Sequence, residues 1–233
     1  MIKLRRVAKT LLDTYVGKRT GERVLKGLVK RGDGETIHAA LWFSDLREFT
    51  ALTETLPANK VLAMLNAYFE HVDAAVTPRG GEILRFIGDA MLIVFPADTR
   101  REIDAACQAA VEAALVAFAN LAELNRSRRG AGEPQIQFGV GLNVGEVIYG
   151  NVGAPDRLDF TVMGPAVNRT ARLEGLTKML GVPLLMSAEF VAHLRVPVRS
   201  LGAHEMKGVP KPQEVFALET MRAELRASQP SAA

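Results

Sequence analysis

The stretch EILRFIGDAMLIVF, residues 82–95, decides the fold class of this 233-residue chain. Two apolar runs rich in strand-forming residues, 82–87 and 90–95, lie on either side of the dipeptide Gly88-Asp89. Such a pattern is typical of two strands joined by a tight turn. We therefore predict an antiparallel hairpin that carries Asp89 at its tip.

The segment before this hairpin predicts one strand followed by one helix. Residues 37–43 are apolar and rich in strand formers, so we expect a buried strand that ends at Ser44-Asp45. Pro57 suits the first turn of a helix, and apolar residues recur at helical spacing from 61 to 75. Gly80-Gly81 then ends the helix just before the hairpin.

The segment after the hairpin predicts a long helix. Thr99-Arg100-Arg101-Glu102 has the spacing of a capping box, in which the first and last side chains cap each other's backbone N–H groups. An Ala-rich run follows, and we predict a helix that ends near Asn125. Residues 126–134 are polar and contain Gly, which predicts a loop.

The rest of the chain adds further strands and one helix, so the elements favour an α+β fold. We predict strands over 136–142, 146–152, 158–163 and 214–218, and a helix from Gly164-Pro165 to about Lys178. The first two strands are expected to flank a turn at Asn143-Val144-Gly145. This order predicts a ferredoxin-like βαββαβ core with extra C-terminal strands, whose helices pack on a mainly antiparallel sheet.

Charge divides the chain into two unequal parts. Residues 1–31 contain ten Lys or Arg against Asp13 and Glu22, a net +8, so the other 202 residues carry −5 of the total of +3. The basic segment is therefore no evidence for a core that binds nucleic acid, and none is expected as a partner. We predict a basic helical lead-in or linker over 1–31, which would connect to an upstream sensor or contact a membrane surface. The main domain then spans 32–222, and a disordered tail spans 223–233.

Composition excludes several classes of protein. Hydrophobic residues make up 48% and charged residues 24%, which is typical of a globular domain. The single Cys107 excludes an internal disulfide framework, and no Cys/His cluster has zinc spacing. The first residues are too charged for a signal peptide. With one cysteine, we expect a cytoplasmic protein or the cytoplasmic part of a larger membrane-associated protein.

Two aspartates follow apolar strands and suggest chemistry. Asp45 and Asp89 each come at the end of a predicted strand. Two carboxylates held at neighbouring strand ends would make a hard-oxygen site for Mg²⁺ or Mn²⁺. Either residue alone is explained as well by a helix cap or a hairpin turn.

Four motifs together resemble the catalytic domain of class III adenylate and guanylate cyclases. They are FSDLREFT at 43–50, RFIGDA at 85–90, TVMGPAVNRTAR at 161–172 and MKG at 206–208. The resemblance spans roughly 37–219 and includes the bacterial-like subclass that has Thr at position 161. It implies a nucleotidyl cyclase that makes cyclic AMP and pyrophosphate from ATP.

The resemblance also implies a role for each matched residue. Asp45 and Asp89 would bind two divalent ions, and the backbone carbonyl of Leu46 would contact metal. Asn168 would orient the ribose, and Arg172 would stabilise charge on the transferring phosphate. The remaining substrate contacts would come from Lys207 and Arg157 on the phosphates and from Arg85 and Thr161 on the base.

Base preference stays open at this stage. Adenylate cyclases usually have Lys, and guanylate cyclases Glu, where this chain has Arg85. Arg85 only donates hydrogen bonds, and the missing Glu removes the usual acceptor for guanine, so ATP is favoured.

The alternatives to an adenylate cyclase are a guanylate or dual-specificity cyclase and a catalytically silent cyclase-homology module for dimerisation or sensing. In the resembled family, one subunit supplies the two Asp residues and its partner supplies the other groups. A homodimer with shared sites is therefore expected.

Overall fold

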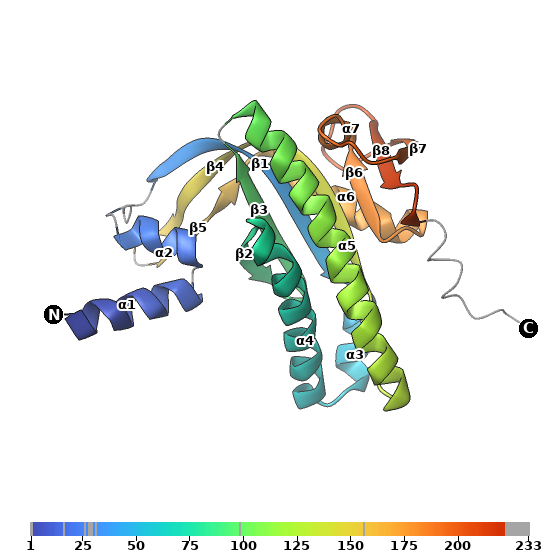
Figure 1. The fold of residues 1–233 in the computed structure, drawn as a ribbon, viewed down its shortest axis with the longest axis horizontal. Coiled ribbons are helices and arrows are strands. Elements are labelled where there is room, and N and C mark those ends of the chain that lie inside the picture. Colours follow the sequence, from blue (N-terminus) through green and yellow to red (C-terminus); the bar gives the residue numbers. More distant parts are fainter. Residues whose placement is uncertain are drawn as a thin grey trace, which may run out of the picture.

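The computed structural model describes residues 2–221 apart from 16, 26, 28, 29, 31, 98 and 156 (Figure 1). The predicted tail, 223–233, lies outside the described residues. The helices are α1 (Ile2–Tyr15), α2 (Lys18–Leu25), α3 (Phe49–Thr55), α4 (Ala58–Val76), the 3-10 turn η1 (Thr77–Arg79), α5 (Arg100–Gly130), α6 (Pro165–Leu180) and α7 (Ala188–Val191). The strands are β1 (Gly34–Leu46), β2 (Glu82–Ile87), β3 (Ala90–Ala97), β4 (Phe138–Ala154), β5 (Arg157–Met163), β6 (Leu184–Ser187), β7 (Val198–His204) and β8 (Gln213–Leu218).

The sheet has the predicted ferredoxin-like core. Its strand order is β2-β3-β1-β4-β6-β8-β7, and β5 pairs with β4 outside this path. The elements β1, α4, β2, β3, α5 and β4 form the βαββαβ unit, in which every strand pair is antiparallel. The pair β4–β6 is parallel. The predicted α+β class and the predicted hairpin are confirmed, and the extra C-terminal strands lie at the β6–β7 edge.

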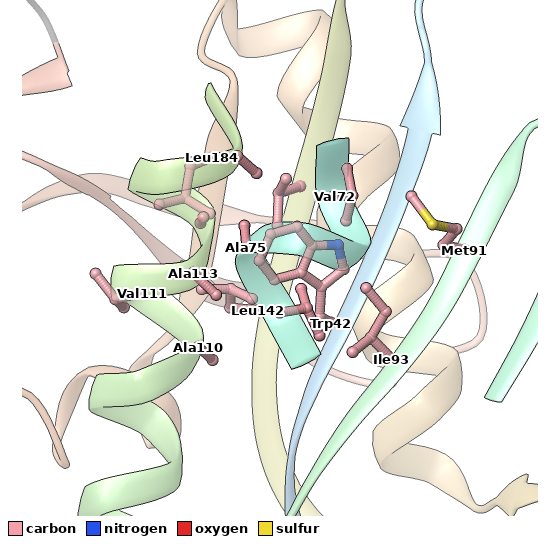
Figure 2. Close-up of a cluster of buried hydrophobic side chains, with 14 of the residues drawn as sticks. Trp42, Val72, Ala75, Met91, Ile93, Ala110, Val111, Ala113, Leu142 and Leu184 are labelled. Carbon is pink, nitrogen blue, oxygen red and sulfur yellow. The ribbon is translucent and has the colours of Figure 1, made fainter. Parts of the chain in front are cut away.

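One face of the sheet is covered by α4 and α5, which lie side by side in Figure 1. Trp42 of β1 is fully buried under them. Figure 2 shows its ring surrounded by small and aliphatic side chains from α4, α5 and β4, among them Val72, Ala75, Ala110, Ala113 and Leu142. The alanines of α5 let that helix lie close to a large ring, which explains why the helix is Ala-rich.

The opposite face of the sheet is covered in part by α6. Gly141 of β4 lies under this helix, and a Cβ atom at that position would stand 2.5 Å from the backbone nitrogen of Glu174. No side chain fits at such a distance, so glycine is needed for β4 and α6 to approach this closely. The motif 161–172 is therefore held directly against the central strands.

The predicted turn at Asn143-Val144-Gly145 is wrong, because β4 is one strand of 17 residues that pairs with the whole of β1. Asn143 is buried, donates to the carbonyl of Ala166 at 3.0 Å and accepts from Ser187 at 2.7 Å. A Cβ at Gly145 would lie 2.9 Å from Cβ of Ala166. Asn143 and Gly145 therefore pack against α6. Asn and Gly are also the residue types that favour turns, so the sequence alone does not separate the two roles.

The predicted end of the long helix is also wrong, since α5 continues past Asn125 to Gly130. Polar residues of the expected loop instead fasten the next segment. Asn125 makes two hydrogen bonds of 2.8 Å with the backbone of Ile136, and Arg128 donates to the carbonyl of Pro134 at 2.7 Å. The predicted capping box of Thr99 and Glu102 is confirmed.

By length and composition α5 could cross a membrane, and it is the one helix in the described part of the chain that passes this test. Its buried side packs on α4 and the sheet. We therefore interpret it as a core helix.

The basic N-terminal segment contacts the main domain through α2. Thr20 is buried and bonds to the carboxylate of Glu82 and the hydroxyl of Tyr149. Arg23 pairs with Glu35 and lies over the Tyr149 ring, 4.6 Å from its centroid. The boundary near residue 32 stays a prediction, and a cut there would uncover Glu82 and Tyr149.

Candidate active site

Strand pairing brings the two predicted metal ligands to one end of the sheet. Asp45 is the penultimate residue of β1 and lies opposite Gly139 of β4. Asp89 lies in the turn between β2 and β3, where Gly88 has a φ of 64° that favours glycine. Because Ser44 pairs with Met91, the end of β1 and the hairpin tip are neighbours.

Burial and nearby negative charge shape the chemistry of Asp45. Burial raises the pKa of its carboxyl to about 7, helped by a hydrogen bond to Asp89 and by the charges of Asp89 and Glu174. Oδ1 of Asp45 is buried and has no hydrogen-bond partner. A buried carboxylate oxygen without a donor, next to a second carboxylate, lacks the positive charge that would stabilise it.

A divalent cation fits this pair of carboxylates. Mg²⁺ prefers oxygen ligands and is usually held by one or two carboxylates, with water and substrate phosphates completing its shell. Within the described residues no group of three or more His, Cys, Asp or Glu side chains could hold a metal ion. The assignment of Asp45, Asp89 and the carbonyl of Leu46 as the protein's metal ligands stays a prediction.

An ion pair that sequence analysis missed lies beside Asp45. Arg47 donates to Oε1 of Glu174 at 3.2 Å, and a second guanidinium nitrogen contacts Oγ1 of Thr177. The Glu174 side chain is 7% exposed and that of Arg47 19%. Each residue looks like a solvated charge in the sequence, and 127 positions separate them, so no local pattern pairs them.

Backbone strain is found at Glu48, the residue directly after Arg47. Glu48 has a φ of 58°, and it is the one residue other than glycine with a positive φ in the described part of the chain. Such a conformation costs free energy and persists where surrounding structure fixes it. Here it turns the chain from β1 into α3.

The second group of predicted residues lies on α6 and the loop between β7 and β8. Asn168 and Arg172 are four residues apart on α6, so they project from the same side of the helix. An Nη atom of Arg172 lies 3.9 Å from where a Cβ of Gly208 would stand. Residues 205–212, including Lys207, line a hollow of about 530 Å³. The structure thus brings Arg172 and the Lys207 loop together beside an open hollow, whose charged lining residues are Glu205, Lys207 and Lys211.

The predicted base contacts, Arg85 and Thr161, lie on β2 and β5. Arg85 donates to Asp159 at 2.6 Å in an ion pair whose side chains are about half exposed. Asp159 and Thr161 are two apart on β5, so their side chains lie on one face of the strand. Asp159 was missed, although alternation along the strand could have singled it out.

A β-bulge immediately precedes Arg85. The pairing of β2 with β3 shifts between Ile83 and Arg85, which leaves one extra residue in β2. Bulges re-aim the side chains that follow them. Arg157 is exposed at the start of β5, opposite Ala154.

Comparison with known proteins gives the same answer as the motifs. Residues 34–220 match the family described as the adenylate and guanylate cyclase catalytic domain. Adenylate cyclase 1 of Rhizobium meliloti (strain 1021) is 35% identical over 200 residues, which cover 79% of this chain and 29% of that protein. The chain thus spans about a third or less of the curated relatives that it matches first.

Two solved structures are also similar. A bacterial light-regulated adenylyl cyclase is 29% identical with a TM-score of 0.77, over 94% of this chain and 63% of that one. The guanylyl cyclase Cya2 is 30% identical with a TM-score of 0.66, over 79% and 93%. With its family match over nearly the whole described domain, this chain belongs to the adenylate and guanylate cyclase catalytic domain family.

Proposed function

We propose that the chain converts ATP to 3′,5′-cyclic AMP and pyrophosphate at sites shared between two subunits of a homodimer. The observation that carries this proposal is the buried oxygen of Asp45, without a hydrogen-bond partner and next to Asp89. A buried carboxylate oxygen that no donor reaches is well placed to bind a cation.

Two divalent ions, Mg²⁺ or Mn²⁺, would supply the positive charge that lowers the pKa of the ribose 3′-hydroxyl and holds the triphosphate. The carboxylates of Asp45 and Asp89 and the carbonyl of Leu46 would hold those ions. Asn168 would orient the ribose, while Arg172 would stabilise negative charge on the transferring phosphate.

The hollow between β7 and β8 has two lysines in its lining that suit the leaving pyrophosphate. Lys207 lines it, and Arg172 lies at the neighbouring Gly208. Lys207 would bind the β- and γ-phosphates and stabilise their charge as the bond to the α-phosphorus breaks, while Arg172 beside it would stabilise charge on the α-phosphate that is transferred. Arg157 would be a further phosphate contact.

Base preference rests on the Arg85–Asp159 pair together with Thr161. Arg85 donates, so it suits N1 of adenine, and Asp159 accepts, so it suits the exocyclic amine. Similarity to named adenylate cyclases supports the same preference. The acceptor that seemed to be missing is present in Asp159, which also favours a second candidate, a guanylate or dual-specificity cyclase. Similarity to the guanylyl cyclase Cya2 supports that alternative.

A shared site is supported by where the charged groups lie and by exposed apolar side chains on two strands. The carboxylate pair lies beside the Arg47–Glu174 ion pair, while Arg172 belongs with the Lys207 loop. Phe86, Ile87 and Ile148 are 46–53% exposed on β2 and β4. Covering these side chains with a second copy would bury apolar surface and complete each half-site.

Product identification tests the proposal. Purified protein is incubated with ATP or GTP, in Mg²⁺ or Mn²⁺, and the products are separated by chromatography. We expect cyclic AMP and pyrophosphate from ATP in a metal-dependent reaction that Asp89→Asn abolishes. Absence of any cyclic nucleotide under all four conditions would favour the silent module for dimerisation or sensing.

A cytoplasmic location, and a sensor or membrane contact through residues 1–31, belong to the same proposal.

A further inference from the structure

Arg47 and Glu174 connect two parts of the chain that the proposed function assigns to different active sites. Arg47 lies two residues after Asp45, and Glu174 lies two residues after Arg172 on α6. In a dimer with shared sites, Asp45 of a protomer acts in one site and Arg172 of the same protomer acts in the other. The ion pair therefore links the strand end that carries Asp45 to the helix that carries Arg172.

The Arg47–Glu174 pair occupies space that β4 leaves open at Gly139. A Cβ at Gly139 would stand 2.1 Å from a guanidinium nitrogen of Arg47 and 2.5 Å from Oε1 of Glu174. Glycine at this position of β4 leaves the space that the pair occupies. The backbone N–H of Arg47 also donates to the carbonyl of Gln137 at 2.8 Å, which fixes the start of the arginine next to β4.

The contacts make the pair rigid. Two different guanidinium nitrogens reach Glu174 and Thr177, which lie three residues apart on α6. A fork with two partners fixes the orientation of a helix better than a single point contact does. Because Glu174 is buried, a shift of α6 relative to β1 would leave its charge unpaired, which is costly.

We propose that Arg47 and Glu174 form a positioning pair that couples the two active sites of the dimer. It sets the distance between the metal ligands of one site and Asn168 and Arg172 of the other. A displacement of reacting groups by an ångström costs one to two orders of magnitude in rate, so loss of the pair should reduce turnover at both sites. This inference rests on the proposed function.

The first test separates positioning from stability with three variants, Arg47→Met, Glu174→Gln and the double variant. Each single change leaves one buried charge unpaired, so both the melting temperature and kcat should fall. The double change removes both charges, so the melting temperature should recover while kcat stays at least about tenfold below wild type. We also expect a higher metal concentration for half-maximal activity. Recovery of kcat together with the melting temperature would show that the pair is only structural.

Arg47→Lys provides a second, independent test if the double variant folds poorly. Lysine keeps the buried positive charge but cannot reach Glu174 and Thr177 with two fixed nitrogens. The melting temperature should stay within about 3 °C of wild type while kcat falls. Wild-type kcat in this variant would overturn the proposal.

Glu133→Gln, in a more exposed ion pair with Lys60 and Arg128, is the matched control and should leave kcat unchanged.

Coupling itself is tested in a mixed dimer of Asp45→Asn and Arg172→Ala chains, in which one site is intact. Glu174→Gln is then added to either chain. In one chain the pair supports the working Arg172, and in the other it supports the working Asp45, so both additions should lower activity about tenfold. If only one addition has an effect, the pair does not couple the sites. If wild-type protein makes no cyclic nucleotide, the proposed function has failed instead.

Discussion

Two arginine–carboxylate pairs in this domain differ mainly in their exposure. The side chains of Arg47 and Glu174 are 19% and 7% exposed, whereas those of Arg85 and Asp159 are 48% and 44% exposed. A buried pair loses much when one partner is removed, while an exposed pair contributes about 0–1 kcal/mol. The buried pair is thus suited to holding elements in place, and the exposed pair is free to exchange its partner for a ligand.

The largest expected effect belongs to the two carboxylates of the proposed metal site. Asp89→Asn keeps the size of the side chain but removes the charge that would hold the metal ions. We expect metal-dependent turnover to fall by about two orders of magnitude or more. Product formation at saturating Mn²⁺ measures this effect, with the melting temperature as a control for folding. Near-wild-type turnover would mean that Asp89 is not a metal ligand.

Gly139→Ala is expected to have the next largest effect. The new methyl group would collide with Arg47, Glu174 and Thr177, and overpacking of this kind costs about 1–3 kcal/mol. Chemical denaturation should report that loss of unfolding free energy. The matched control is Gly130→Ala, because a Cβ at Gly130 meets no atom within 4 Å. Equal stability of the two variants would contradict the described packing.

Changes at the exposed Arg85–Asp159 pair should alter the preference for ATP over GTP rather than the stability of the protein. Arg85→Glu removes the donor to adenine and leaves two acceptors, so the ratio of kcat/KM for ATP to that for GTP should move about tenfold toward GTP. The melting temperature should change little, because the pair is exposed. Arg85→Lys retains the donor and is the control. An unchanged ratio in Arg85→Glu would exclude Arg85 from base recognition.

Glu48→Gly should have the smallest effect. Glycine adopts the observed φ of 58° without the steric cost that glutamate bears, although it loses more entropy on folding. We expect the unfolding free energy to change by less than about 1 kcal/mol, toward higher stability. A clear loss of stability in denaturant titration would show that the Glu48 side chain itself is needed.

Local patterns were sufficient to predict much of the fold. The Gly88 turn and the Thr99 capping box depend on residues close in sequence, and both are found where predicted. Asn143 and Gly145 were misinterpreted because tertiary packing against α6 uses the same residue types as a turn.

The site was predicted residue by residue from family motifs, and those assignments stay predictions. The partners of those residues could not be found in the same way. Arg47 and Glu174 meet only because Gly139 and Gly141 let α6 approach β4, which is a property of the folded state. Asp159 was accessible to reasoning from strand alternation, since it lies two residues before Thr161.

The central claim is that each active site takes Asp45 from one subunit and Arg172 from the other. The direct measurement mixes two inactive proteins, Asp45→Asn and Arg172→Ala, and records cyclic nucleotide formation after subunit exchange. In the mixed dimer one site carries both changes and the other carries neither. Activity should therefore return to about half that of a wild-type dimer per mixed dimer. No activity, with exchange demonstrated independently, would contradict the account.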